Sequence, residues 1–67
     1  MPQYKFMVLD HRDHLIEVLE VPFSSDVLAS ERAKAIYIER SAHAVEVWQS
    51  ARFICRMNQV GLEFAAA

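Results

Sequence analysis

The chain has 67 residues with a single cysteine, Cys55. This length allows one domain with a small core, and a lone cysteine excludes an internal disulfide. Small domains usually gain stability from a disulfide, a metal or a partner chain. One cysteine and three scattered histidines rarely complete a tetrahedral zinc site. Oligomerisation is therefore the remaining way to add stability to this small domain. We expect no cofactor.

Charge and hydropathy limit the partners. The net charge of −2 provides no overall basic field for nucleic acid. No apolar run is long enough to span a membrane or to form the core of a signal peptide. A chain with one free thiol is typical of the cytoplasm, where we expect this protein. The apolar content of 54% argues against disorder and exceeds what a small core can bury.

The first two expected elements are strands joined by a polar loop. In residues 3–9, QYKFMVL, apolar and polar positions alternate, which is typical of a strand. Residues 15–21, LIEVLEV, form a second such run. The segment between them, DHRDH, has the length of a hairpin loop.

A helix is expected from about residue 26 to residue 41, because Pro22 ends the second strand and Ser24, Ser25 and Asp26 are good N-cap residues. The helix has two apolar stripes on nearly opposite sides. The first stripe contains Ala29, Ala33, Ile36 and Tyr37. The second contains Val27, Leu28, Ala35, Ile38 and Ala42.

Residues 44–48, AVEVW, and 52–57, RFICRM, alternate again and predict a second hairpin. The expected fold is therefore α+β, in the order ββαββ, with a four-stranded antiparallel sheet and the helix packed on one face. Residues 1–58 form this single domain. Residues 59–67 are expected to be a tail outside the fold, disordered or vector-derived.

The opening MPQYKFMVLD and the stretch HAVEVWQSARFICRM carry a resemblance. They resemble a family of small bacterial proteins of unknown function that begin Met-Pro-x-Tyr-x-Phe and close on a Val-Glu-Val-Trp hairpin. The resemblance covers residues 1–58. It implies the fold and no activity, since the family has none established. The first turn of that family is usually rich in Asp and Gly, whereas this chain has His11-Arg12-Asp13-His14.

The DHRDH loop allows three interpretations. The preferred one is a structural turn, since Asp side chains often bond their own backbone in turns. A metal site would need His11, His14 and a carboxylate to converge on one point. A His–Asp pair could also act as a catalytic base, but no nucleophile lies beside it, and Cys55 is expected in the core. We therefore expect no enzymatic activity.

Two surfaces are candidates for contact with a partner. If Tyr4, Phe6, Val8, Val45, Val47, Phe53, Cys55 and Met57 face the helix, the opposite sheet face mixes apolar residues with Trp and Arg, as interface hot spots do. The candidate residues there are Met7, Leu9, Trp48, Arg52, Ile54 and Arg56. On the second helix stripe they are Leu28, Ala35 and Ile38. The alternative is a half-solvated face. A three-residue turn would set Trp48 opposite Arg52, whereas a two- or four-residue loop would set it opposite Phe53 and change these faces.

The leading functional hypothesis is a non-catalytic protein–protein interaction module that forms a homodimer, with an unidentified protein as another partner. The first alternative is nucleic-acid binding, with Trp48 stacking on a base and Lys5, Arg52 and Arg56 contacting phosphate. The net charge argues against that alternative. The second is a small metal-binding protein that uses His11 and His14.

Overall fold

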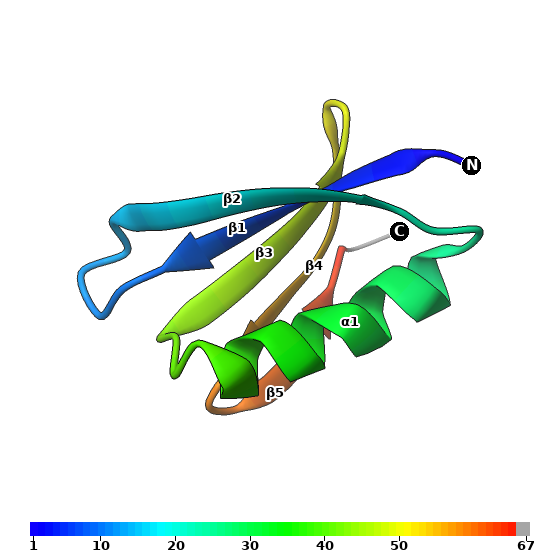
Figure 1. Ribbon diagram of the computed structural model, residues 1–67. Helices are drawn as coiled ribbons and strands as arrows, with labels where there is room; N and C mark the ends of the chain where they lie inside the picture. The colour runs from blue at the N-terminus through cyan, green and yellow to red at the C-terminus, as the bar shows by residue number, and fades with distance from the viewer. Residues whose placement is uncertain (66–67) are drawn as a thin grey trace.

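The computed structural model describes residues 1–65, which form one helix and five strands. The elements are β1 Gln3–Leu9, β2 Leu15–Pro22, α1 Asp26–Glu39, β3 Ala44–Gln49, β4 Arg52–Asn58 and β5 Gly61–Phe64. All strand pairs are antiparallel, in the order β2-β1-β3-β4-β5. Helix α1 crosses one face of this sheet, as Figure 1 shows. The α+β class and the antiparallel sheet are therefore confirmed.

The strand count is one higher than the predicted four. β5 lies within the segment that we expected to be a tail, and it pairs with β4 from Asn58↔Gly61 to Cys55↔Phe64. Leu62 packs against the core. The sequence pattern was misleading because Gly61 interrupts it and the strand that follows has only four residues. Residues 66 and 67 lie outside the described part of the chain.

The core lies between α1 and the three central strands. Ala29, Ala33 and Ile36 are buried on α1, and Tyr37 packs against them, so the first predicted stripe faces the sheet. Two alanines on this stripe allow the helix backbone to approach the sheet closely. The strands contribute the following buried side chains: Tyr4, Phe6, Val8, Val45, Val47, Ile54 and Cys55.

Within residues 1–65, α1 is neither long nor apolar enough to be a transmembrane helix.

A bulge in β4 changes which of its residues reach the core. Val47 pairs with Cys55 and Trp48 pairs with Phe53, so Ile54 is the extra residue. At such a bulge the alternation of side chains is interrupted. Ile54 and Cys55 are both buried, at 3% and 0% exposure. The prediction that Phe53 faces the helix and Ile54 faces away was therefore wrong. The turn has two residues, Ser50 and Ala51, and sets Trp48 opposite Phe53, which is the alternative register that the sequence left open.

Ser25 is the N-cap of α1, and Ser41 follows the C-cap residue Arg40. Ser25 has an extended backbone and its Oγ accepts a hydrogen bond from the Leu28 amide at 3.3 Å, which satisfies one of the free donors of the first turn. After the C-terminus, Ser41 adopts a positive φ of 51°. The Ala42 amide then donates to the Tyr37 carbonyl at 3.1 Å, the bond expected of a Schellman motif. Glycine normally occupies the position that Ser41 holds.

Ser41→Gly is expected to stabilise the domain by about 0.5–1 kcal/mol. Ser41 has a φ of 51°, which glycine reaches without the steric cost that a Cβ imposes. Urea unfolding followed by circular dichroism would measure the change. Ser24→Gly, in the link before α1, is the control and should not stabilise. A loss of stability in Ser41→Gly would contradict the steric argument.

Candidate interaction surface

The sheet face opposite α1, here called the outer face, carries Lys5, Met7, Val18, Glu20, Glu46, Trp48, Phe53 and Arg56. These positions alternate with the buried ones along each strand, apart from the bulge. No helix or strand among residues 1–65 covers this face. This face of the sheet is therefore left open to a partner.

A polar network lies at the middle of the outer face. Trp48 Nε1 donates to Glu46 at 3.1 Å, and Arg56 donates to the same carboxylate at 2.8 Å. Arg56 also reaches Asp13 in the β1–β2 loop at 2.9 Å. The hydrogen bonds to Asp13 and Glu46 raise the pKa of the Arg56 guanidinium. The Trp48 ring packs edge-on against Phe53 with 5.2 Å between the ring centroids.

The structure separates the six sheet residues that we predicted to share one surface. Met7, Trp48 and Arg56 are half-buried on the outer face, as expected. Ile54 is buried because of the bulge in β4. Leu9 is 7% exposed and lines a cleft at the end of β1, where the pairing with β2 shifts. Neither Ile54 nor Leu9 is therefore available to a partner.

Arg52 is also misplaced by the prediction, since it lies on the α1 side of the sheet. Its guanidinium donates to both carboxylate oxygens of Asp26, at 3.0 and 3.1 Å. Tyr4 Oη donates to the same carboxylate at 2.7 Å. The hydrogen bonds from Arg52 and then Tyr4 lower the pKa of Asp26, while the bond to Asp26 raises that of Tyr4. This cluster joins the start of α1 to β1 and β4.

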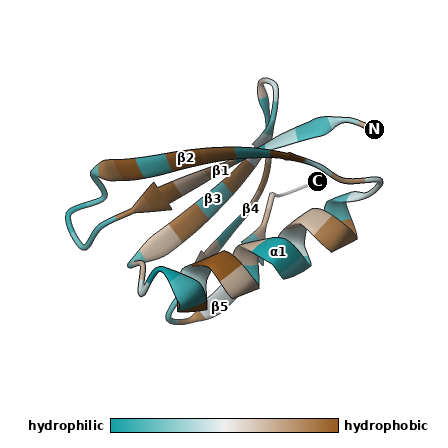
Figure 2. Ribbon diagram, viewed as in Figure 1, coloured by the Kyte–Doolittle hydropathy of each residue, from teal (hydrophilic) through white to brown (hydrophobic). Residues whose placement is uncertain are grey.

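A further exposed apolar surface lies on β2, for which the sequence predicted no site. Leu15, Ile16 and Val18 are 49%, 59% and 42% exposed, and we call them the β2 patch. Figure 2 shows the hydrophobic colour along most of this strand. The signal in the sequence is the run LIEVLEV, whose apolar residues occupy both odd and even positions. Such a strand has an apolar surplus on whichever face it turns outward.

The second stripe of α1 is exposed only in part, because Ala42, which we placed on it, packs against the core. Val27, Leu28 and Ile38 are 67%, 48% and 72% exposed, and Ala35 is half-buried. Glu31 and Lys34 lie between them on the helix surface and form an ion pair at 3.3 Å. Single apolar residues separated by charges are ordinary on a protein surface. Charged side chains therefore interrupt the exposed part of this stripe.

The DHRDH loop has the geometry of a turn. Asp10 Oδ1 accepts hydrogen bonds from the amides of Arg12 and His14, at 2.8 and 2.9 Å. The bonds from His14 and Arg12 lower the pKa of the Asp10 carboxyl. Asp13 adopts a positive φ of 60°, which Asp tolerates better than most residues. The loop thus uses one carboxylate for its backbone and the other for the ion pair with Arg56.

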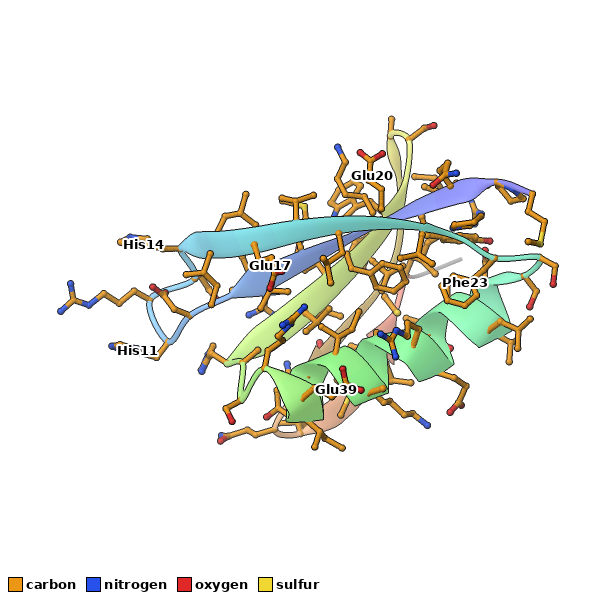
Figure 3. All side chains as sticks on the ribbon, viewed as in Figure 1. His11, His14, Glu17, Glu20, Phe23 and Glu39 are labelled. Carbon is orange, nitrogen blue, oxygen red and sulfur yellow. The ribbon has the colours of Figure 1, made fainter. Side chains whose placement is uncertain are left out.

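The two histidines of the loop do not converge. Figure 3 shows the side chains of His11 and His14 ending at separate places on the loop. Across residues 1–65, no three His, Cys, Asp or Glu side chains are grouped so that they could hold a metal ion. The geometry therefore provides no ligand set for the metal-binding alternative. Cys55 is buried, as predicted, and burial raises the pKa of its thiol to about 11.

The basic residues do not gather around Trp48. Arg52 is bound to Asp26 on the other face, and Arg56 is bound to Glu46 and Asp13. Lys5 is the remaining neighbour, opposite Trp48 on β1. A phosphate backbone needs free cationic groups along its path. No observation therefore favours the nucleic-acid alternative.

Compared with protein-family models, curated protein sequences and solved structures, the chain matches none of them. The interpretation of this surface therefore rests on its geometry and chemistry.

Proposed function

We propose that the chain is a protein–protein interaction module that self-associates as a homodimer and has no catalysis of its own. The observation that supports this proposal is the β2 patch, formed by Leu15, Ile16 and Val18 on an edge strand next to the open outer face. Three exposed apolar side chains within four residues of an edge strand favour a contact site. Its burial contributes about 25 cal/mol for each Å² removed from water.

The size of the domain supports the same proposal. A 67-residue chain buries a smaller fraction of its surface than a larger domain does, so a partner chain supplements its core. A symmetric dimer needs only one kind of surface, and two-fold dimers are the commonest closed assemblies. We place this module in the cytoplasm, because its single thiol, Cys55, is free.

The expected result is a mass of twice 7.7 kDa by light scattering, falling toward the monomer mass on dilution. The dilution series matters because a true equilibrium depends on protein concentration. High salt is the control, since it weakens charge pairs and leaves an apolar contact intact. A monomer mass at every concentration up to about 1 mM, where even a weak contact would be populated, would overturn the proposal.

A further inference from the structure

We infer that the dimer forms by antiparallel pairing of β2 with β2 of a second copy, which joins two five-stranded sheets edge to edge. This inference rests on the proposed self-association and adds its geometry. β2 is one edge of the sheet, and nothing among residues 1–65 pairs with its outer side. In Figure 1 β2 runs along the edge of the sheet, and the contacts of α1 are mainly with β3 and β4.

The backbone of β2 has donors and acceptors directed away from β1. The Phe23 amide donates to the Pro2 carbonyl at 3.2 Å, which fixes the phase of the β1–β2 ladder. In an antiparallel ladder the residues that bond the neighbouring strand alternate. The register then directs the backbone amides and carbonyls of Leu19 and Val21 toward β1. Those of Val18 and Glu20 point away from the sheet. These outward amides and carbonyls can form hydrogen bonds with the same groups of β2 in a second copy, when the two strands are antiparallel.

Both ends of β2 limit how this edge can pair. Pro22 has no amide hydrogen to donate. At the other end, Val8 pairs with Glu17 and Leu9 pairs with Leu15, so Ile16 is an extra residue in a bulge. Bulges interrupt a ladder. Only the short segment between these two ends can add a strand, which suits one closed contact rather than open-ended assembly.

One register uses all the available groups. With the two-fold axis at Leu19, Val18 of each copy lies opposite Glu20 of the partner subunit, and Pro22 lies opposite the bulge at Ile16. All four outward amides, two from each copy, then have acceptors. An axis at Glu20 would oppose two like charges, which is unfavourable. An axis at Val18 would place Glu20 of each copy opposite the bulge at Ile16 of the partner subunit, where the regular hydrogen bonding of the ladder is interrupted.

The side chains of β2 are compatible with this register. Figure 3 shows Glu17 and Glu20 leaving the strand on opposite sides, with Glu17 directed toward α1. Glu17 is neutralised within the chain by Arg40 at 3.2 Å. Glu20 lies opposite Lys5 on β1, so positive charge is close to each Val18–Glu20 contact. The apolar side chain of Val18 would be covered by the partner strand.

Disulfide trapping tests the register directly. Val18→Cys and Glu20→Cys are purified separately, unfolded together, refolded as a 1:1 mixture and oxidised with copper–phenanthroline. Hydrogen-bonded antiparallel pairs have about 5.5 Å between Cα atoms, within the range that a disulfide spans. The mixture should therefore give a covalent dimer on a non-reducing gel. Each variant alone should give several-fold less, because residues of the same number lie diagonally across the axis.

Two controls complete the design. Ile38→Cys, on the exposed stripe of α1, reports contact through the helix. The native Cys55 is buried, so the unmodified chain should not cross-link. Equal yields at all positions, or the highest yield for Ile38→Cys, would overturn the β2 pairing while a dimer mass in light scattering kept the proposed function. A monomer mass for the unmodified chain would overturn both the β2 pairing and the proposed homodimer.

Discussion

Ile54→Ala is expected to lower the free energy of unfolding by about 3 kcal/mol, and Phe53→Ala by only about 1.5 kcal/mol. Ile54 is 3% exposed within the core, so truncation leaves a cavity between β4 and α1. Phe53 is half-buried on the outer face, and its main aromatic contact is with Trp48. Phe53 is the larger side chain, yet its truncation is expected to lower the free energy of unfolding less than truncation of Ile54.

Urea unfolding by circular dichroism, at one fixed protein concentration, would measure both changes. The fixed concentration keeps any contribution of the dimer equal between variants. Val47→Ala is a useful reference, because its position in the core does not depend on the bulge. If Phe53→Ala cost more than Ile54→Ala, the side chains of β4 would alternate without interruption and the bulge would be absent.

Asp26→Asn is expected to cost about 1–2 kcal/mol at neutral pH. The substitution removes the charge that Arg52 contacts with two hydrogen bonds and that favours the N-terminus of α1. The ion pair alone contributes at the low end of this range, because the side chains of Asp26 and Arg52 are 43% and 55% exposed. The remainder comes from the helix dipole and the bond from Tyr4.

The pH dependence follows from the lowered pKa of Asp26. A carboxyl with a lower pKa in the folded state stabilises that state above its unfolded pKa, near 3.9. That stabilisation is lost as the pH falls through the folded pKa. The stability difference between the unmodified chain and Asp26→Asn should therefore be full at pH 6 and shrink below about pH 4.

Tyr4→Phe is the matched control for Asp26→Asn. It removes one hydrogen bond to Asp26 and keeps the ion pair with Arg52, so its cost should be smaller and most of the acid sensitivity should persist. Asp10 also has a lowered pKa, so some acid sensitivity should remain in every variant. A difference between the unmodified chain and Asp26→Asn that did not change with pH would contradict the role of the charge.

The regular parts of the fold were predictable from the sequence because periodicity reports them. The stripe of Ala29, Ala33 and Ile36 identified the buried side of α1, and alternation identified β1 to β4. β5 was missed because four residues after a glycine carry too little pattern. The bulges were missed because one extra residue interrupts the alternation between the two faces, and alternation alone does not mark where that happens.

The candidate surface was less predictable than the fold. Trp48, Met7 and Arg56 were placed on the outer face, yet Arg52 and Ile54 were not where alternation put them. The β2 patch was not identified, because which edge of the sheet a strand occupies depends on strand order. That order comes from the pairing of β1 with β3, which are distant in the sequence. Local sequence patterns do not indicate such a long-range pairing.

The strand order also bears on how the chain reaches its folded state. β1–β2 is a local hairpin, and β3–β4–β5 is a local meander. Only the β1–β3 pairing joins the two, and it closes a long loop that contains α1. Loop closure costs conformational entropy before its contacts form, so we expect this step to limit the rate of folding. A preformed α1 makes that loop shorter and stiffer, which gives the helix a kinetic role in addition to its packing.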